Sequence, residues 1–273
     1  MGQMTLQKFQ KIILDWYKTN RRSMPWRNTK DPYKILVSEI MLQQTQVSRV
    51  LPKYKEFLKA FPTIKKLARA EDKKLLKVWQ GLGYWRRAKF LKETAHRLSG
   101  SSLPRDPKTL QTLPGIGPYT ARAVACFAFG NTEAFLDTNI RRVYLHFFFP
   151  KRHNVADSEI LPVAQKAVWK KDSRRWHYAL FDYGAMVLKN KKINRQSKHY
   201  DKQNKFEGSF RSFRTKVVKL LLNSPRDKLP AQKVRNFLEQ ELTKENSTFS
   251  SQEILNDLVK DGLLKKTTDS YAL

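Results

Sequence analysis

The turn that decides the fold reads Leu113-Pro114-Gly115-Ile116-Gly117-Pro118-Tyr119-Thr120. Its two glycines allow a tight turn and a close approach of the backbone to a bulky partner. The apolar run from Ala121 to Phe129 predicts a helix that leaves this turn, and the N–H groups at a helix start form a site for an anion. Twenty residues after Gly117 the chain carries Asp137, which is either a functional carboxylate or only the cap of the helix that follows.

A strongly positive charge characterises the chain, which holds 54 Lys and Arg against 24 Asp and Glu and has a formal net charge of +30 over 273 residues. This balance favours a nucleic acid as the partner, because phosphates attract Lys and Arg without any reading of base sequence. No apolar run is long enough to span a bilayer and no signal-peptide pattern opens the chain. We therefore expect no membrane partner and a cytoplasmic, nucleoid-associated location. The single cysteine, Cys126, rules out an internal disulfide, suits a reducing compartment and is expected to pack in the core.

Helical spacing of apolar residues dominates the first 190 residues, where no alternating strand pattern occurs, so this part is predicted to be all-α. One helix opens at Asp31-Pro32, with a cap and an N-terminal proline, and contains the stretch from Ser38 to Gln46. Pro104 and Pro107 mark a loop before the glycine turn. The expected helices are 6–18, 31–46, 49–61, 64–69, 72–80, 85–98, 121–129, 140–148, 158–169 and 173–187.

Glu39 is an unusual member of the helix that opens at Asp31. Its neighbours at three and four residues are Ile35, Leu36, Leu42 and Gln43, so its carboxyl shares a largely apolar face. A carboxyl that such a face desolvates has a raised pKa, which suits a general acid at neutral pH. The alternative is an ordinary Glu at the edge of an amphipathic helix, paired with a lysine.

The composition changes after residue 188. Residues 189–210 form a basic, weakly periodic connector that either lies along a phosphate backbone or is a solvated linker. Residues 211–273 return to helical periodicity, with helices expected at 213–222, 230–242 and 250–260 and a hairpin around Thr268-Asp269-Ser270. Three helices and a hairpin suggest a small winged-helix-like α/β domain. Its third helix carries Glu253, Asp257 and Asp261, a poor complement to phosphates, so we expect this domain to contact protein rather than to read a groove.

The glycine turn and Asp137 together resemble the helix-hairpin-helix and aspartate of the endonuclease III-like DNA glycosylases. Three further motifs narrow the resemblance to the adenine DNA glycosylases of the MutY type: Pro25-Trp26-Arg27, Ser38-Glu39-Ile40-Met41-Leu42-Gln43-Gln44-Thr45-Gln46-Val47 and Gly81-Leu82-Gly83-Tyr84-Trp85. The resemblance covers roughly residues 5 to 188. It implies a two-domain fold, in which a six-helix barrel domain over 31–145 packs against a second helical domain made of 1–30 and 146–188. DNA is expected in the cleft between them.

The family's catalytic roles fall on four residues of this chain. The resemblance implies that Glu39 is the general acid that protonates adenine and that Asp137 stabilises positive charge on the deoxyribose, with Asn139 supporting Asp137. Bifunctional relatives carry a Schiff-base lysine at the position of Tyr119. A tyrosine cannot form that adduct, so a monofunctional glycosylase that uses water is implied.

Other residues match positions that contact DNA or the excised base. Arg27, Trp26 and Asp182 match the lining of the base pocket, while Gln44 enters the base stack and Tyr84 wedges beside the opposite base. The hairpin is expected to hold the DNA backbone through Gly115, Gly117 and Thr120. By resemblance, a monovalent cation is bound by the backbone carbonyls of Gln111, Leu113 and Ile116.

Two features depart from the family pattern. Most such enzymes hold an iron–sulfur cluster through four cysteines after the Gly184-Ala185 position, whereas residues 187–206 contain no cysteine here. Because such clusters need thiolate ligands, we expect no cluster and no other cofactor beyond the cation. The family's usual Nudix-like domain, which recognises 8-oxoguanine, is not expected here, because the winged-helix-like segment stands where the resemblance would place it.

The resemblance thus implies a monofunctional DNA glycosylase of base-excision repair that removes adenine mispaired with guanine or 8-oxoguanine from double-stranded DNA. One alternative is a glycosylase for thymine or uracil opposite guanine, since some of those enzymes share the tyrosine at position 119. The other is a DNA-binding module that kept the hairpin and lost the chemistry. The preference between guanine and 8-oxoguanine is left open, and a monomer is expected by default.

Overall fold

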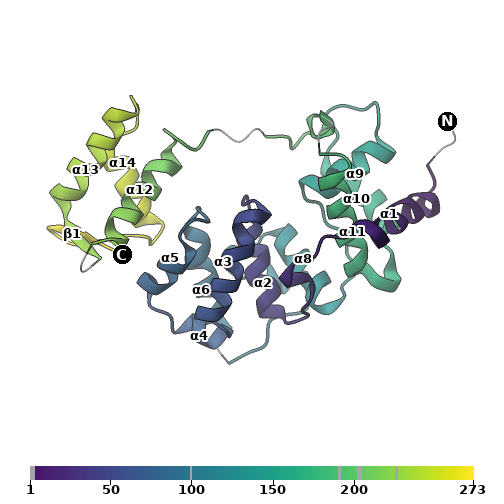
Figure 1. Ribbon diagram of the computed structural model, residues 1–273, viewed down its shortest axis with the longest axis horizontal. Helices are drawn as coiled ribbons and strands as arrows, with labels where there is room; N and C mark the ends of the chain where they lie inside the picture. Colours follow the sequence, from purple (N-terminus) through teal and green to yellow (C-terminus); the bar gives the residue numbers. More distant parts are fainter. Residues whose placement is uncertain (1–3, 99, 190–191, 202–204, 225–226) are drawn as a thin grey trace. The chain divides into compact units, whose positions relative to one another are not determined.

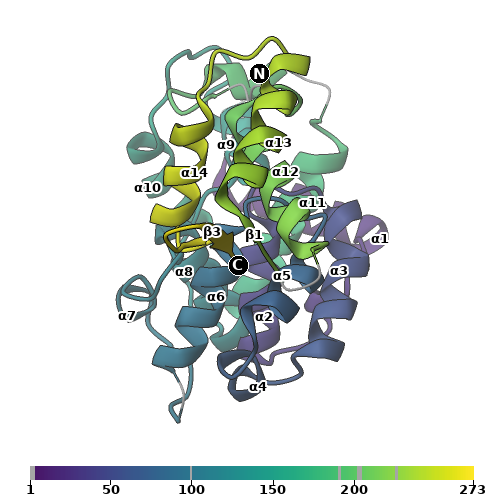
Figure 2. The ribbon, with the colours of Figure 1, turned by 90° about the vertical axis from the view of Figure 1, so that its left-hand side faces the viewer.

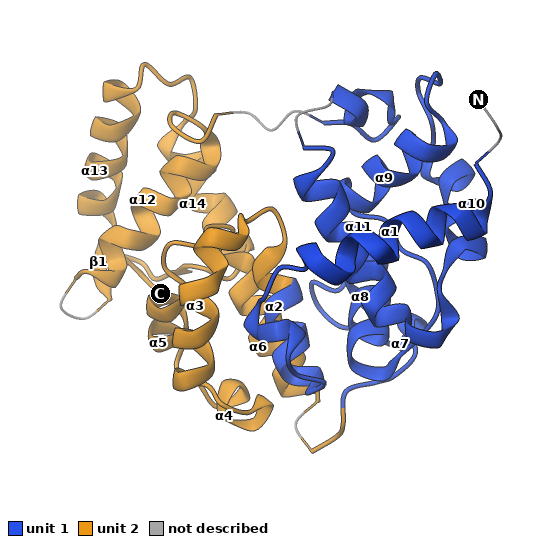
Figure 3. Cartoon of the chain, turned by 45° about the vertical axis from the view of Figure 1, so that its right-hand side comes forward, with its two compact units in different colours: residues 1–39, 103–202 blue, residues 40–102, 203–273 orange. Residues whose placement is uncertain are grey.

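The computed structural model describes residues 4–98, 100–189, 192–201, 205–224 and 227–273, and the chain divides into two compact units (Figures 1 and 3). Unit 1 contains residues 1–39 and 103–202, and unit 2 contains residues 40–102 and 203–273. Each unit therefore combines segments that are far apart in the sequence. The predicted domain boundaries at residues 30, 145, 188 and 210 stay a prediction.

Unit 1 is helical and is built around a cluster of aromatic side chains. Phe9 is fully buried and lies against four other rings, with centroid separations of 5.0 to 5.5 Å. These rings come from Tyr144, Phe147, Phe148 and Trp176, so the first helix is fixed against two helices that lie more than 130 residues later in the sequence. The elements are α1 (Leu6–Asn20), η1 (Pro25–Arg27), α2 (Pro32–Leu42, which continues into unit 2), α7 (Pro107–Leu110), α8 (Pro118–Phe129), α9 (Thr138–Phe148), α10 (Asp157–Ala167), η2 (Lys170–Asp172), α11 (Ser173–Met186) and η3 (Lys192–Gln196).

Part of the predicted basic connector folds onto unit 1. The Nε of Arg142 in α9 donates a hydrogen bond to Asn194 Oδ1 over 3.2 Å. The Val155 N–H donates to the Gln196 carbonyl over 2.8 Å and the Lys198 N–H donates to the Val155 carbonyl over 2.9 Å, around an isolated bridge between Val155 and Ser197. Residues 192–198 are therefore ordered by packing against α9 rather than extended.

Unit 2 begins with four helices: α3 (Val47–Ala60), α4 (Ile64–Ala68), α5 (Asp72–Trp79) and α6 (Arg86–Arg97). Their apolar faces bury Phe57, Phe61 and Trp79, whose rings lie 5.0 to 5.9 Å apart. Asp72 accepts hydrogen bonds from Lys89 and Lys92 at 2.6 and 2.7 Å, which ties the start of α5 to α6.

The C-terminal part of unit 2 is the predicted winged-helix-like domain, in which three helices gather around a small sheet (Figure 2). The antiparallel sheet has the order β1-β3-β2, and the fully buried Tyr271 sits in its central strand opposite Leu229 and Lys266. The elements are α12 (Phe210–Leu222), β1 (Lys228–Pro230), α13 (Ala231–Lys244), α14 (Ser251–Lys260), β2 (Lys265–Lys266) and β3 (Ser270–Ala272).

The predicted fold class, an all-α protein with a small C-terminal α/β domain, is confirmed within the described residues. The sequence analysis missed α7, because a four-residue helix begins at Pro107 inside what reads as a loop, and β1, because three residues are too few to show an alternating pattern. Among the helices of the described part of the chain, none combines the length and the apolar content needed to cross a bilayer.

Candidate active site

Glu39 lies in α2 and is almost fully buried, with 4% of its surface exposed, beside the buried Ile35 and Leu36. Burial raises the pKa of its carboxyl to about 7. A hydrogen bond from the Tyr119 hydroxyl opposes this shift, the negative charge of Asp137 adds to it, and the positive charge of Arg27 opposes it. The apolar face inferred from the sequence therefore produces the expected effect: a carboxyl that holds a proton close to neutral pH.

Tyr119 comes from the helix that the glycine turn opens. Its hydroxyl donates to Glu39 Oε2 over 3.2 Å, and its ring packs edge-on against the buried Phe135 with centroids 5.7 Å apart. Burial, together with the charges of Glu39 and Asp137, raises the pKa of the Tyr119 hydroxyl well above its ordinary value, so the group remains a donor. The hairpin thus places one of its own side chains on the candidate acid.

Asp137 is the N-cap of α9. Its Oδ1 accepts the Ile140 N–H at 2.7 Å, and its Oδ2 accepts a hydrogen bond from the Asn139 side-chain amide at 3.0 Å. Burial raises the pKa of Asp137, while these hydrogen bonds and the positive end of the helix favour its ionised form. The cap predicted for Asp137 is confirmed, and its charge also raises the pKa of Glu39, while its role as a functional carboxylate stays a prediction.

The two carboxyls have unlike surroundings. Two N–H groups donate to Asp137, whereas the Glu39 carboxyl receives one tyrosine hydroxyl and lies beside the buried Ile35 and Leu36. Surroundings that separate the protonation of two nearby carboxyls assign one as acid and the other as anion. Both carboxyls have a raised pKa, and only Asp137 accepts hydrogen bonds from N–H groups, so their roles as acid and anion stay a prediction.

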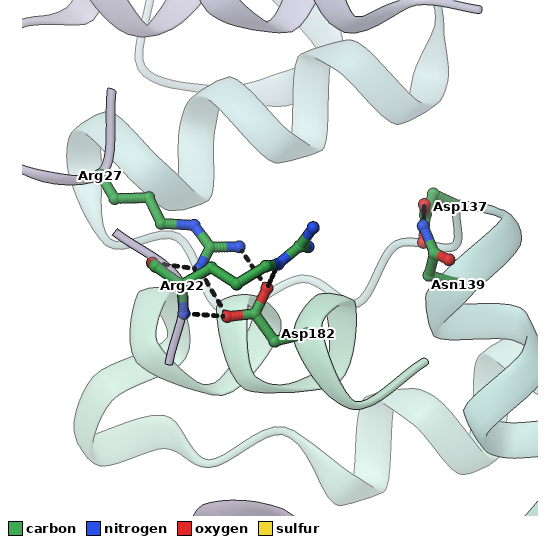
Figure 4. Close-up of polar contacts among 5 residues, drawn as sticks. All are labelled: Arg22, Arg27, Asp137, Asn139 and Asp182. Atoms are coloured by element: carbon green, nitrogen blue, oxygen red, sulfur yellow. Dashed lines mark hydrogen bonds and ion pairs between the residues drawn. The ribbon is translucent and has the colours of Figure 1, made fainter. Parts of the chain in front are cut away.

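Asp182 in α11 is completely buried and is held by two arginines (Figure 4). Arg27 binds both carboxylate oxygens, with distances of 2.7 and 2.9 Å, and Arg22 donates from its backbone N–H at 3.0 Å and from Nε at 2.6 Å. Burial alone would raise the pKa of Asp182, but these hydrogen bonds and charges outweigh it and lower the pKa. Sequence reasoning missed Arg22, because a pair 160 residues apart leaves no local pattern.

The guanidinium of Arg27 has a second neighbour, the ring of Tyr178, whose centroid lies 4.5 Å away. The Arg27 side chain is 8% exposed, and the Arg27 Nε has no hydrogen-bond partner within the described residues. Trp26, which precedes it, is 2% exposed. Asp182 thus fixes the buried guanidinium of Arg27, whose Nε–H makes no hydrogen bond within the described residues and whose charge acts on Glu39.

Gly184 sets how closely α11 approaches the residue that supports Asp137. A β-carbon on Gly184 would lie 2.3 Å from the backbone oxygen of Asn139, so only glycine fits there. The Gly184 carbonyl accepts a hydrogen bond from Arg142 at 2.7 Å, which fixes α9 against α11. The motif that ends in Gly184-Ala185 therefore positions Asn139.

The hairpin itself joins α7 to α8. Gly115 has a φ of +72°, which favours glycine, whereas Gly117 has an ordinary φ of −82° and a β-carbon on it would meet no atom within 4 Å. Thr120 is 2% exposed, and the phosphate contact expected of it stays a prediction. In the predicted cation site, the Leu113 carbonyl accepts the Ile116 N–H at 3.2 Å and keeps a second lone pair, and the roles of Gln111, Leu113 and Ile116 stay a prediction.

Gln44 and Tyr84, the residues expected to enter DNA, lie in two neighbouring loops of unit 2. Both have a left-handed backbone, with φ of +51° and +45°. The prediction that the Glu39 helix continues to Gln46 is wrong, because α2 ends at Leu42 and the chain turns at Gln44. The roles of these two side chains stay a prediction.

Arg87 holds both loops, and the sequence analysis did not identify it. Its buried guanidinium donates to six backbone carbonyls and one hydroxyl of the two loops and the end of α2. Desolvation lowers its pKa to about 10, so it stays charged at neutral pH. The acceptors are the carbonyls of Ile40, Met41, Gln43, Leu82, Gly83 and Tyr84 and the hydroxyl of Thr45.

An iron–sulfur cluster ligated by four thiolates does not fit this chain, whose one cysteine, Cys126, is fully buried. Burial raises the pKa of its thiol to about 12, and it lies 3.5 Å from Nδ1 of the buried His177. Cys126 is therefore core packing, as expected. Across the described ranges, no group of three or more His, Cys, Asp or Glu side chains is arranged to hold a metal ion.

These features define the class: a helical protein with a helix-hairpin-helix and, beside it, a buried pair of unlike carboxyls. Residues 37–164 match the family described as HhH-GPD superfamily base excision DNA repair protein. The chain belongs to this superfamily.

Individual relatives agree with this assignment. An adenine DNA glycosylase of Mycolicibacterium smegmatis is 49% identical over 135 residues, which is 48% of this chain and 46% of the relative. An adenine DNA glycosylase of Buchnera aphidicola is 36% identical over 196 residues, or 67% of this chain and 54% of the relative. The solved structure of a thermostable thymine-DNA glycosylase superposes with a TM-score of 0.62 at 31% identity, covering 68% of this chain and 89% of that one. The chain spans about half the length of the two adenine DNA glycosylases.

Proposed function

We propose that the protein is a monofunctional DNA glycosylase that hydrolyses the N-glycosidic bond of adenine mispaired with guanine or 8-oxoguanine, in base-excision repair. The observation that carries this proposal is the pair of unlike carboxyls, in which burial raises the pKa of Glu39 to about 7 and Asp137 accepts hydrogen bonds from the Ile140 N–H and the Asn139 amide. Glycosidic cleavage needs both forms at once, since a base must be protonated while positive charge develops on the sugar.

In the proposed reaction, Glu39 gives its proton to a ring nitrogen of adenine. The glycosidic C–N bond then breaks with its electron pair going to the neutral base, and Asp137 stabilises the cationic sugar. Water adds to the sugar carbon and loses a proton, which leaves an abasic site. Tyr119 orients the Glu39 carboxyl and has no amine with which to form a Schiff base, so the strand stays intact.

The target base must leave the duplex to reach this pair, at a cost of a few kcal/mol. We assign Arg27, Trp26 and Asp182 to the base pocket, where the Nε–H of Arg27 is suited to a base edge. Gln44 and Tyr84 are assigned to the base stack. Gly115, Gly117 and the backbone of Thr120 hold the phosphate backbone, together with a monovalent cation at the hairpin. The proposed enzyme needs no iron–sulfur cluster and acts on double-stranded DNA as a monomer in the cytoplasm.

A second candidate is a glycosylase that removes thymine or uracil opposite guanine. It is favoured by the likeness to the thymine-DNA glycosylase, which extends over 89% of that chain. Adenine is favoured by the higher identity to adenine DNA glycosylases, at 49% and 36%. The pair of Glu39 and Asp137 would serve for either base, so tests with different substrates must decide which base is excised.

The test is to incubate purified protein with labelled duplexes containing A:G, A:8-oxoguanine, T:G or U:G, with and without alkali afterwards. Cleavage of the adenine strand only after alkali supports the proposal, because alkali breaks the chain at abasic sites. Cleavage at T:G or U:G instead would support the second candidate. Duplex binding without release of any base would mean that the protein is a non-catalytic DNA-binding module.

A further inference from the structure

The loop that carries Tyr84 is bound directly by the C-terminal domain. Tyr84 accepts a hydrogen bond on its hydroxyl from Nη1 of Arg211, at the start of α12. The next residue, Trp85, donates from its ring N–H to the Thr215 hydroxyl over 3.4 Å. Two successive loop residues therefore meet two successive turns of α12, and all of them belong to unit 2.

The acids of the C-terminal domain stabilise this contact. Asp261, which is 8% exposed on its side chain, forms ion pairs with both Arg86 and Arg214. Arg86 follows the Tyr84 loop and Arg214 belongs to α12, so one buried carboxylate links the two segments. Asp261 therefore has a structural role, since it holds α12 against the segment that follows the Tyr84 loop, and Asp257 of α14 pairs with the same Arg214.

Tyr84 is confined by two cations. Its ring centroid lies 5.3 Å from the guanidinium of Arg87 and 5.2 Å from that of Arg211. Arg87 also bonds the Tyr84 carbonyl, and the backbone φ of +45° is a conformation that a tyrosine rarely adopts. Arg87 fixes the backbone of this residue, and Arg211 fixes the far end of its side chain.

We propose that Arg211 is a positioning residue for Tyr84, through which the C-terminal domain sets how strongly the protein distinguishes the base opposite the excised one. This inference rests on the proposed function, in which Tyr84 wedges beside that base. When both the backbone and the hydroxyl of Tyr84 are bound, its ring enters the duplex in one orientation, so its contact depends on which base lies opposite. When only the backbone of Tyr84 is bound, its ring can turn to fit any opposite base.

The test measures binding to duplexes that carry an uncleavable abasic-site analogue opposite 8-oxoguanine, guanine or cytosine. The full-length wild type is compared with Arg211→Ala, Arg211→Lys, Tyr84→Phe and the double variant Arg211→Ala/Tyr84→Phe. We expect Arg211→Ala to reduce the ratio of dissociation constants between cytosine and 8-oxoguanine duplexes about threefold to tenfold, in line with the strength of a cation–π contact and a hydrogen bond. Arg211→Lys should restore part of the ratio, and the double variant should lose little more than Arg211→Ala alone.

Lys216→Ala is the matched control, because Lys216 lies on the same helix and pairs with Glu241 and Glu245 inside the C-terminal domain. A wild-type ratio for Lys216→Ala and a reduced ratio for Arg211→Ala support the inference. An unchanged ratio for Arg211→Ala, or an equal loss of affinity for all three duplexes, overturns it. Because this readout needs no base release, a wild-type protein that excises no adenine overturns the proposed function separately.

Discussion

The hydroxyl of Tyr119 lies 3.2 Å from Oε2 of Glu39 and donates a hydrogen bond to it. This bond joins the hairpin to the candidate acid and partly offsets the effect of burial on the carboxyl, whose pKa is raised to about 7 with the bond in place. The hairpin is therefore linked to Glu39 directly, since a side chain in the first turn of α8 lowers the pKa of that carboxyl.

Removing this hydroxyl should shift the pH dependence of base release. Tyr119→Phe keeps the ring and removes the donor, so the pKa of Glu39 should rise further and the loss of activity at alkaline pH should move upward by on the order of one pH unit. Single-turnover excision rates between pH 5 and pH 9 measure the shift. Tyr183→Phe, which lies outside the acid pair, serves as the control. An unmoved alkaline limb would show that the hydrogen bond has no influence on the acid.

Replacing Glu39 should slow base release strongly and leave duplex binding nearly unchanged. Glu39→Gln keeps the shape of the side chain and cannot donate the proton, so base release should fall roughly 10²- to 10⁴-fold while duplex affinity changes little. Rates and dissociation constants measured on the same duplexes separate the two effects. Retained excision by this variant would refute the proposed mechanism.

The same substitution should stabilise the fold at alkaline pH. The pKa of Glu39 rises from 4.5 to about 7 on folding, so between these values the folded protein keeps a proton that the unfolded chain releases. The free energy of unfolding therefore falls as the pH rises through this window, by about 3 kcal/mol at most. Urea unfolding at pH 5 and pH 8 should show that Glu39→Gln gains stability relative to wild type at pH 8. Glu93→Gln, at an exposed ion pair with Arg97, should show no such pH-dependent gain.

Local patterns predicted the parts of the site that depend on neighbours in the sequence. The apolar spacing around Glu39 predicted its burial and its raised pKa, and the position of Asp137 before a helix predicted its cap. Glycine spacing predicted the hairpin. Each of these features arises from groups within a few residues of one another, which is the range over which helix periodicity and capping operate.

Contacts between distant segments were beyond such reasoning. Arg87 occupies an ordinary position in a basic amphipathic helix, and only the fold reveals that carbonyls from residues 40–43 and 82–84 surround it. The arginines that hold Asp182 lie 155 and 160 residues away from it. The prediction that α2 reaches Gln46 failed for the same reason, since the carbonyls at the end of α2 are satisfied by Arg87 rather than by further helical turns.

The two glycines of the hairpin should behave differently when replaced. Gly115→Ala forces a side chain into a left-handed backbone with φ of +72°, which should cost roughly 1–2 kcal/mol of stability. Gly117→Ala meets no atom of the chain, so stability should hold while a phosphate near the α8 N-terminus would be displaced and duplex affinity should fall. Thermal unfolding and binding to an undamaged duplex measure the two properties. Equal affinity for Gly117→Ala and wild type would exclude this turn as a phosphate contact.

Gly184→Ala should impair the proposed function of Asp137 indirectly, through Asn139. The added β-carbon would lie 2.3 Å from the Asn139 backbone oxygen, so α9 must shift away from α11 or the local structure must strain. We expect a loss of roughly 1–3 kcal/mol in stability, and a fall in the excision rate because Asn139 no longer bonds Asp137 in the same geometry. Asn139→Ala, which deletes that bond but leaves the helix packing unchanged, should reproduce the rate loss with a smaller stability loss. If Gly184→Ala loses stability but keeps the wild-type rate once folded, the close approach of α11 to Asn139 serves packing alone.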